Sequence, residues 1–504
     1  MSLTMALHRG VQQHPTRTFS VFGDRVMTYA QTADRVSRIA GGFKELGLDA
    51  DDRVALLALN SDVYLQTVLA VAWADAVIVP VNTRWSLTEI ADSLAEAEVS
   101  MLVVDENFTA MAAELSRLVP GIRWVIAADE LTNTGPQIPD AHRSGDNPIG
   151  IFYTGGTTGR SRGVVLSHSA LVSSALGCAA GSPIDPSSVC LISAPLFHLA
   201  QFSGWVASMI MGTSHVIIAT FDPVEVMRII EKRRVTRAVL VPTMLHMLLN
   251  HPKEPDFDLT SLATVTYGGS PISPATLSQA QQRWPQTGFL QVYGMTEMAA
   301  TVTMLAPDAH NDPVLIASAG QAAPHTVIRI VDPNGADVPT GEIGEVVVRG
   351  DGMMTEYWQR PDETAAVIRD GWFHTGDAGR LNDDGYVFIV DRVKDMIVSG
   401  GENVYSAEVE NAVATHPSVS QCAVIGLPDE TWGERVHAVV VLHNGADLAL
   451  QDLQSHCRSA IAGYKCPRGL TVVDALPLSP TGKVLKRELR KAHSVDAIRE
   501  TQPT

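Results

Sequence analysis

Apolar positions follow two alternating periods along the first half of the chain. Spacings of three and four residues predict helices, and short unbroken apolar runs predict buried strands. We expect helices at residues 29–46, 63–74, 87–97 and 222–234, and strands at residues 53–59, 76–81, 100–105 and 238–242. Strands that alternate with helices in this way indicate βαβ units around a parallel sheet.

From about residue 327 the pattern changes to short β-rich runs separated by turn signals such as Pro333-Asn334-Gly335. Strands are expected at residues 327–331, 344–349, 386–390, 423–426 and 436–442, with a helix at 406–416. A chain of 504 residues is too long for one ordinary core, so two or more domains are expected. We place the boundary after Arg392, which gives an N-terminal domain of residues 1–392 and a C-terminal domain of residues 393–504.

Charge and composition narrow the classes of function. A formal net charge of −18 argues against binding to nucleic-acid backbones or anionic membranes. Residues 186–221 contain no charged side chain, but prolines, glycines and histidines interrupt them, so we interpret them as buried core rather than an integral membrane segment. The five cysteines form no C-x-x-C pair, which is typical of reduced thiols in a cytoplasmic protein.

Residues 151–163 carry the clearest chemical signal. They read Ile-Phe-Tyr-Thr-Gly-Gly-Thr-Thr-Gly-Arg-Ser-Arg-Gly, an apolar strand end that runs into a loop of small and hydroxyl residues. Glycines let the backbone approach an anion closely, while hydroxyl and backbone N–H groups donate to phosphate oxygens. The spacing fits neither a Walker A loop nor a G-x-G-x-x-G fingerprint, so a different kind of phosphate site is predicted.

This loop resembles the YTSGTTG-x-PKG signature of the adenylate-forming superfamily, which includes acyl-CoA synthetases, peptide-synthetase adenylation domains and beetle luciferase. Four further blocks match in order: Gln291-Val-Tyr-Gly-Met-Thr-Glu297, Trp372-Phe-His-Thr-Gly-Asp377, residues 391–403, and Pro480-Thr-Gly-Lys483. The resemblance covers essentially the whole chain. It implies an α/β fold whose large N-terminal domain has parallel-rich βα sheets and a small distorted β-barrel, followed by a small mobile α+β C-terminal domain.

The resemblance also implies how the chain holds ATP. Thr296 would contact the α-phosphate, Glu297 would help to hold Mg²⁺, and Asp377 would accept hydrogen bonds from the ribose hydroxyls. Arg392 would be a second contact, to the ribose or to a phosphate. The remaining implied ATP and AMP ligands are Thr154, Gly155, Gly156, Thr157, Thr158, Gly159 and Arg162 at the phosphates, Gly268, Gly269, Ser270, Gln291, Val292 and Tyr293 around the adenine, and Gly294.

The same resemblance places the catalytic lysine and the channel for the coenzyme A thiol in the C-terminal part and at its junction. Lys483 would bridge the substrate carboxylate and the α-phosphate, because the reaction joins two anions and a cation must stabilise the developing charge. Lys394 would lie in a hinge about which the small domain rotates, and Ser399, Gly400 and Gly401 would border the channel for the pantetheine arm of coenzyme A.

The acyl pocket is expected around a segment that contains no acidic group. Residues 199–204 lack the Asp that amino-acid-activating relatives use to pair the substrate's amino group, so an amino-acid substrate is disfavoured. We predict a medium-sized carboxylic acid, either a medium-chain fatty acid or an aryl or cyclic acid. The residues expected to line the pocket are His198, Leu199, Gln201, Phe202, Thr266, Gly269, Val292 and Gly294.

The predicted activity is that of an acyl-CoA synthetase, which uses ATP, Mg²⁺ and coenzyme A. Two alternatives stay open: an acyl-AMP ligase that loads a carrier-protein thiol, and a degenerate member that only binds nucleotide. Gly155, Ser161 and Arg162 depart from the commonest loop sequence, which leaves the strength of ATP binding open. The sequence also leaves open whether the protein is a homodimer.

Overall fold

The computed structural model describes residues 1–133, 135–154, 161–392, 395–399, 402–429, 431–478 and 484–493. The chain forms two compact units. The first contains residues 1–328 and 348–373, and the second contains residues 329–347 and 374–504. The domain boundary after Arg392 that the sequence predicts stays a prediction.

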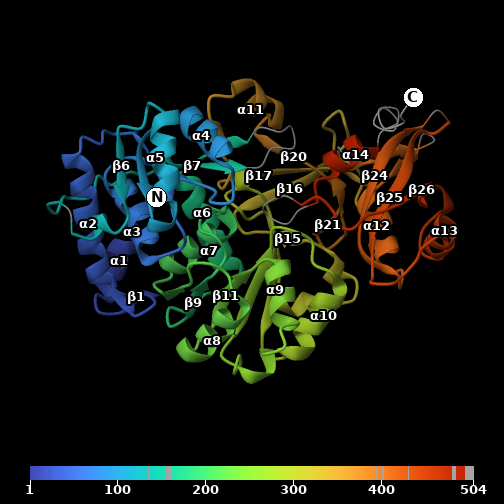
Figure 1. The fold of residues 1–504 in the computed structure, drawn as a ribbon, viewed down its shortest axis with the longest axis horizontal. Helices are drawn as coiled ribbons and strands as arrows, with labels where there is room; N and C mark the ends of the chain where they lie inside the picture. Colours follow the sequence, from blue (N-terminus) through green and yellow to red (C-terminus); the bar gives the residue numbers. More distant parts are fainter. Residues whose placement is uncertain are drawn as a thin grey trace. The chain divides into compact units, whose positions relative to one another are not determined.

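A seven-stranded sheet occupies one side of the first unit (Figure 1). Parallel pairs join β3 to β4 and β5, and β5 to β6, while β7, β8 and β18 pair antiparallel. The strand order is β18 (Glu356–Tyr357), β8 (Arg162–Ser167), β7 (Pro148–Thr154), β4 (Val77–Pro80), β3 (Arg53–Leu57), β5 (Val99–Val104) and β6 (Trp124–Ala127). The outer helices are α4 (Leu87–Glu96) and α5 (Thr109–Leu118), which contact β5.

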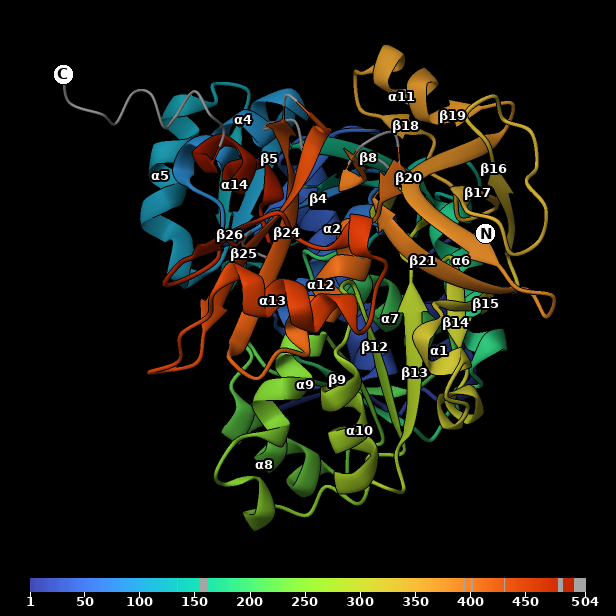
Figure 2. The ribbon, with the colours of Figure 1, turned by 90° about the vertical axis from the view of Figure 1, so that its right-hand side faces the viewer.

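A second sheet of the first unit is parallel at its centre. Its order in this unit is β15 (Gly320–Ala322), β14 (Thr303–Leu305), β13 (Gly288–Tyr293), β12 (Thr264–Gly268), β11 (Arg237–Leu240), β9 (Val189–Ile192), β10 (Ser214–Ile217), β1 (Thr18–Phe22) and β2 (Arg25–Thr28). One face is covered by α8 (Pro223–Arg233), α9 (Pro242–Leu249) and α10 (Pro274–Arg283), whose apolar side chains form one core with β11, β12 and β13 (Figure 2).

Three helices lie between these two sheets: α3 (Asp62–Trp73), α6 (His168–Gly181) and α7 (Leu199–Ile210). Helix α3 contacts β1 of one sheet and β3 and β4 of the other, and α6 packs on α7 while each touches a different sheet. Every residue of α3 is buried, as expected for a helix that is apolar on all sides. The uncharged residues 186–221 form β9, α7 and β10, so their interpretation as buried core is confirmed.

No helix among the described residues is both long enough and apolar enough to cross a membrane. The remaining helices of the first unit are α1 (Met5–Gln13), α2 (Tyr29–Glu45) and α11 (Pro361–Val367), and the short β19 (Ile368–Arg369) pairs with β20 (Trp372–Leu381).

The second unit contains a five-stranded sheet and an open run of four strands. The sheet comprises β23 (Glu402–Val404), β22 (Ile397–Ser399), β25 (Gly433–Leu442), β24 (Val419–Asp429) and β26 (Gly469–Val472). It packs with α12 (Ser406–Ala414), α13 (Leu450–Arg458) and α14 (Lys486–His493).

The other run of strands corrects one expectation. Strands β16 (Thr326–Val331), β17 (Gly344–Gly350), β20 (Trp372–Leu381) and β21 (Tyr386–Arg392) follow one another in order, and β16 ends the series. In the described part of the chain they therefore do not close into the small barrel that the resemblance implied. The reason is that β16 bonds to β17 alone among the named strands.

Candidate functional site

The predicted phosphate loop is held at both ends by one hairpin. Strands β7 and β8 pair antiparallel, and Thr154 lies opposite Arg162 in their register. The predicted ligands Gly155, Gly156, Thr157, Thr158 and Gly159 fall between these two positions and lie outside the described residues. The sequence anticipated the strand before the loop, and the structure adds the returning strand that fixes the loop's second end.

The guanidinium of Arg162 is held beside that loop by an acidic and an aromatic partner. Its Nε lies 2.6 Å from Glu363 Oε2, and its Cζ lies 5.2 Å from the centroid of the Tyr357 ring. Arg360 bonds both Glu363 and Glu96, which ties α11 to α4 of the same unit. The positive charge predicted at this end of the loop is therefore positioned by residues that are distant in sequence.

Tyr357 joins the loop to the predicted magnesium ligand. Its strand β18 pairs with β8, which places Tyr357 opposite Val164, and its hydroxyl donates to Glu297 Oε1 at 2.7 Å. Burial, followed by the charge of Glu297, raises the pKa of the Tyr357 hydroxyl, so it remains a hydrogen-bond donor at neutral pH. Arg162 and Glu297, predicted as parts of one site, are thus brought to the same tyrosine.

The backbone around Thr296 and Glu297 is tightly constrained. Both residues lie in a short 3₁₀ turn, Thr296–Met298, that contacts β8. Ala299 and Ala300 follow with φ of 48° and 82°, a region that costs non-glycine residues energy. The backbone N–H of Met354 donates to the Glu297 carbonyl at 2.7 Å. A sharp, braced turn of this kind presents side chains in fixed directions.

The Glu297 carboxylate fits the predicted role in holding Mg²⁺. It is half-buried, and a hard divalent cation prefers such oxygen ligands. A single carboxylate supplies only part of an octahedral shell, so phosphate oxygens and water would complete it. Among the described residues, the only cluster of three side chains with metal-ligand spacing is His8, Asp140 and His142, where His8 Nε2 lies 2.7 Å from Asp140 Oδ2.

The residues predicted to surround adenine lie at the ends of two adjacent parallel strands. Strands β12 and β13 pair from Thr264 to Gly268, and Gly268 lies opposite Val292. A Cβ at Gly268 would lie 2.2 Å from the Val292 carbonyl oxygen, so only glycine allows this approach. The carboxyl ends of parallel strands are where α/β folds place ligands. Ser270, Gln291, Tyr293 and Gly294 are all half-buried there, and Gly269 is exposed.

The residues predicted for the acyl pocket differ in exposure. His198 is exposed and caps α7, where the backbone N–H of Ala200 donates to its Nδ1 at 3.4 Å. Phe202 is fully buried and packs edge-on against Phe152 of β7, with ring centroids 5.1 Å apart. The other predicted residues comprise Leu199 and Gln201, which are buried, and Thr266, Val292 and Gly294, which are half-buried. Their role in binding an acyl group stays a prediction.

The second unit holds the predicted ribose contacts as an ion pair. Asp377 and Arg392 are register partners on β20 and β21, and Arg392 Nε lies 2.8 Å from Asp377 Oδ1. Asp377 is only 5% exposed, whereas Arg392 is exposed. Ser399 is buried in β22. Lys394, Gly400, Gly401 and Lys483 lie outside the described residues.

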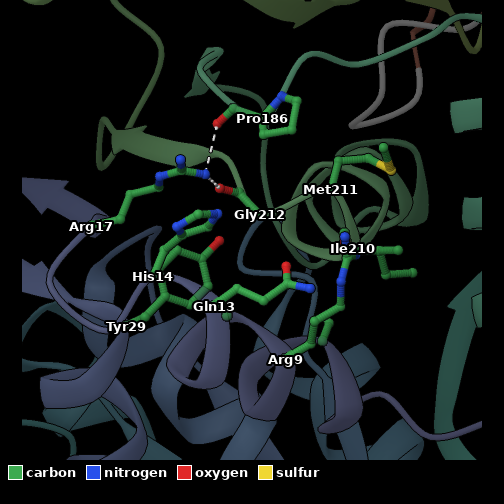
Figure 3. Close-up of a pocket in the computed structure, with 11 residues that line it drawn as sticks. Arg9, Gln13, His14, Arg17, Tyr29, Pro186, Ile210, Met211 and Gly212 are labelled. Atoms are coloured by element: carbon green, nitrogen blue, oxygen red, sulfur yellow. Dashed lines mark hydrogen bonds between the residues drawn. The ribbon is translucent and has the colours of Figure 1, made fainter.

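One small cavity of the first unit contains none of the residues predicted for the active site. It measures about 30 Å³ and is walled by α1, α2 and the end of α7 (Figure 3). Arg17 Nη1 reaches across it to donate to the carbonyls of Pro186 and Gly212, and Arg9 donates to the carbonyl of Ile210. These arginines are already bonded to backbone oxygens, and the cavity is too small for a nucleotide, so we assign it no ligand. The bond from Arg9 to Ile210 joins α1 to α7.

Sequence reasoning did not identify four of the positioning residues, namely Tyr357, Glu363, Arg360 and Glu96. They lie at least 60 residues from the partners they hold across the site, apart from the local Arg360–Glu363 pair, and they fall outside the five sequence blocks that carry the family resemblance. The available signal was the run of an aromatic pair and charges at residues 356–363, which alone is typical of a surface turn.

Comparison with known families covers almost the whole chain. Residues 7–358 match the AMP-binding enzyme family, and residues 408–483 match the AMP-binding enzyme C-terminal domain. The first match contains the loop, Glu297 and Tyr357, and the second ends at Lys483.

Individual relatives agree with these matches. A feruloyl-CoA synthase from Amycolatopsis sp is 39% identical over 96% of this chain and 97% of its own length. The fatty acid–[acyl-carrier-protein] ligase ScoC from Streptomyces coeruleorubidus is 36% identical over 97% and 96%. Among solved structures, the o-succinylbenzoate coenzyme A synthetase MenE from Bacillus subtilis, in complex with ATP and a magnesium ion, has a TM-score of 0.87 and 29% identity, covering 96% of this chain and 98% of its own.

Proposed function

The chain belongs to the AMP-binding enzyme family, and on that premise we propose that it is an ATP-dependent acyl-CoA synthetase that acts on a medium-sized carboxylic acid. The family match spans most of the chain, and the relatives that cover nearly its full length are named as ligases of acids to thiols. Its substrates would be the acid, ATP and coenzyme A, with Mg²⁺ as the metal.

The first half-reaction forms a mixed anhydride. A carboxylate oxygen of the acid attacks the α-phosphorus of ATP, and the bond from that phosphorus to the β-phosphate oxygen breaks, so pyrophosphate leaves. Arg162 would face the phosphates, Thr296 would donate to the α-phosphate, and Glu297 would hold Mg²⁺, which neutralises charge on the leaving pyrophosphate. The ammonium group of Lys483 would lie between the substrate carboxylate and the α-phosphate and stabilise the charge that develops as they join.

The second half-reaction transfers the acyl group. The thiol sulfur of coenzyme A attacks the acyl carbonyl carbon, its proton is lost, and AMP leaves with the carboxylate oxygen that first attacked phosphorus. We propose that the C-terminal part, residues 393–504, rotates between the two steps about a hinge at Lys394. Asp377 and Arg392 would hold the ribose, and Ser399, Gly400 and Gly401 would border the thiol's channel.

The hydrogen bond from Tyr357 to Glu297 is the observation that supports this proposal most strongly. The same tyrosine ring lies against Arg162 at the phosphate-loop hairpin, so one residue positions both a phosphate cation and a metal carboxylate. A degenerate nucleotide-binding member would have no need for this arrangement.

The relatives differ in the acid that they activate and in the thiol that accepts the acyl group. One relative is named for feruloyl-CoA and the other for a fatty acid and an acyl-carrier protein. We propose an aryl, cyclic or medium-chain acid, because the pocket segment at residues 199–204 contains no acidic or other charged side chain. The ScoC match is the specific observation that favours the alternative, in which a carrier-protein thiol replaces coenzyme A.

Pyrophosphate release over a panel of acids, with and without coenzyme A, tests the proposal. The panel contains acetate, C6–C18 fatty acids, cinnamic acids and arylacetic acids, and thioester formation is followed by mass spectrometry. We expect the best turnover on an acid of intermediate size and an acyl-CoA product. Best turnover on acetate, or on C16 and longer acids, would contradict the acid assignment. Pyrophosphate release without any acyl-CoA would instead favour the carrier-protein alternative.

A further inference from the structure

A buried tyrosine and histidine contact Gln291, one of the residues implied at the adenine. Tyr267 is 1% exposed and His310 is 3% exposed. The Tyr267 hydroxyl oxygen lies 2.9 Å from His310 Nε2 and 3.0 Å from Gln291 Oε1, while His310 Nδ1 lies 2.9 Å from the carbonyl oxygen of Ala306. The Gln291 amide, the Tyr267 hydroxyl, the His310 ring and the Ala306 carbonyl thus form one chain of contacts. Each contact needs one donor and one acceptor, which limits the possible directions of the hydrogen bonds.

The backbone carbonyl at one end of this chain fixes the others. The Ala306 carbonyl can only accept, so His310 Nδ1 must carry a proton. In a neutral imidazole, Nε2 is then an acceptor, and it must take the single proton of the Tyr267 hydroxyl. Burial lowers the pKa of His310, which favours this neutral form.

Gln291 must then meet Tyr267 with its amino end. The Tyr267 proton is already used, so a Gln291 oxygen at 3.0 Å would find no donor. An amide turned about its Cγ–Cδ bond places Nε2 there instead and donates to the tyrosine oxygen. The two ends of an amide have almost the same shape, so the hydrogen-bond partners decide which way it turns. The amide carbonyl oxygen is then directed away from Tyr267.

We propose that His310 and Tyr267 are positioning residues that present the Gln291 carbonyl oxygen to the nucleobase and so select adenine. Tyr267 and Gln291 are register partners on β12 and β13, and Gln291 is half-buried at the carboxyl ends of these strands beside Gly268 and Val292. An acceptor at this position matches the exocyclic amino group of adenine and opposes the C6 carbonyl oxygen of a hypoxanthine or guanine base. The inference rests on the proposed function, since it presumes that ATP is the substrate.

The His310→Phe variant tests this orientation directly. It keeps an aromatic ring but removes the acceptor for Tyr267, whose proton then passes to Gln291 Oε1 and turns the amide. ITP is the probe, because inosine differs from adenosine only in the groups at C6 and N1. We expect the ratio of kcat/KM for ATP to kcat/KM for ITP to fall by at least about tenfold, since a site built around one hydrogen-bond pattern rejects the other. Tyr267→Phe should lower the same ratio.

A matched control separates positioning from general damage. His215 is also buried, and burial lowers its pKa, with Nδ1 2.8 Å from the Phe19 carbonyl and Nε2 3.0 Å from the Ser208 hydroxyl. It lies on β10, whereas Gln291 lies on β13. His215→Phe should destabilise the protein and leave the ATP-to-ITP ratio unchanged. Equal ratios in His310→Phe, Tyr267→Phe and the unmodified enzyme would overturn the proposal.

A second readout does not depend on activity. Long-range ¹H–¹⁵N correlation on the unmodified protein reports which ring nitrogen of His310 is protonated. We expect the Nδ1–H tautomer, and an Nε2–H tautomer would overturn the proposal even if the variants failed to fold. Failure of the proposed function would look different, because the unmodified enzyme would then release no pyrophosphate from ATP with any acid while the tautomer stayed as expected.

Discussion

At the scale of single residues, the side chains proposed to act on ATP and Mg²⁺ are held in place by contacts with other side chains. Glu297 is half-buried, with one carboxylate oxygen bonded to Tyr357, and Arg162 lies between Glu363 and the Tyr357 ring. A long arginine side chain loses much rotamer freedom when it is ordered, so pairing it before substrate arrives lowers the entropic cost of binding. Tyr357 is the residue on which both groups depend.

We therefore expect Tyr357→Phe to weaken the use of magnesium and ATP. The change removes a hydrogen bond to a charged group, which contributes about 1.5–3 kcal/mol. The KM for Mg·ATP should rise roughly tenfold or more, as measured by pyrophosphate release at varied Mg²⁺. Tyr29→Phe is the control, because it removes a buried hydroxyl that donates to the Thr213 carbonyl at 2.8 Å. If both variants showed the same KM as the unmodified enzyme, Tyr357 would have no role in holding Glu297.

Buried histidines make the stability of the fold depend on pH. Burial lowers the pKa values of His168 and His215 to about 4, from the ordinary value of 6.5. Between pH 4 and 6.5 the unfolded chain binds more protons than the folded one, so the free energy of unfolding falls as the pH falls through this window. Each histidine can contribute up to roughly 3 kcal/mol to this loss.

Urea denaturation at pH 7.5, 6.0 and 5.0 measures the effect. The midpoint should fall steadily toward pH 5, and His215→Phe should flatten the slope because one of the titrating groups is gone. A midpoint that stays constant over this range would show that these histidines are already protonated in the fold or open to water.

At the scale of elements, the regular βα part of the fold could be predicted and the site's cross-connections could not. The predicted helix at residues 29–46 corresponds to α2, and the strands at 53–59 and 100–105 correspond to β3 and β5. Apolar periodicity reports which face of an element is buried, so it suffices for such units. It carries no information about partners far apart in sequence, so the pairing of β18 with β8 and the contact of Tyr357 with Glu297 were missed.

The residues of the candidate site were predicted from sequence motifs and not from the periodicity of apolar positions. Thr154, Arg162 and Glu297 lie where one hairpin and one turn come together. The small barrel that the resemblance implied is wrong for the described strands of residues 326–392, because the pairing of short strands depends on register, which a sequence motif does not specify.

The turn that carries Thr296 and Glu297 leads to a prediction at this scale. A Cβ at Gly294 would lie 1.9 Å from the Ala300 carbonyl oxygen, so Gly294→Ala must displace the backbone of the turn. We expect a loss of about 1–3 kcal/mol of stability from overpacking, together with reduced adenylation. Gly463→Ala is the control, because nothing lies within 4 Å of a Cβ at that position. Thermal unfolding measures the first effect, and unchanged stability in Gly294→Ala would contradict the close contact.

At the scale of the whole molecule, the proposed mechanism needs the C-terminal part in both half-reactions, with different residues of it acting in each. The two family matches assign residues 7–358 to the AMP-binding enzyme family and residues 408–483, with Lys483 as the last matched position, to its C-terminal domain. If Lys483 of the C-terminal part acts only in adenylation, replacing this lysine should slow the first half-reaction and not the second.

Lys483→Ala should abolish pyrophosphate release, with a fall in rate of about 10²–10³ or more, as is typical for loss of one preorganised charge contact. Thioester formation from supplied acyl-AMP and coenzyme A should be largely spared, and it is measured separately by the appearance of acyl-CoA. Lys491→Ala, a change to another lysine of the C-terminal part, serves as the control. Equal loss of both half-reactions would refute the role given to Lys483.

The most direct test of the central claim follows an oxygen atom. The acid is supplied with both carboxylate oxygens as ¹⁸O, together with ATP, Mg²⁺ and coenzyme A, and the nucleotide product is analysed by mass spectrometry. If the acid is activated as its acyl-adenylate, one ¹⁸O is transferred to AMP for each thioester formed. ADP as the product, or AMP without ¹⁸O, would contradict the account.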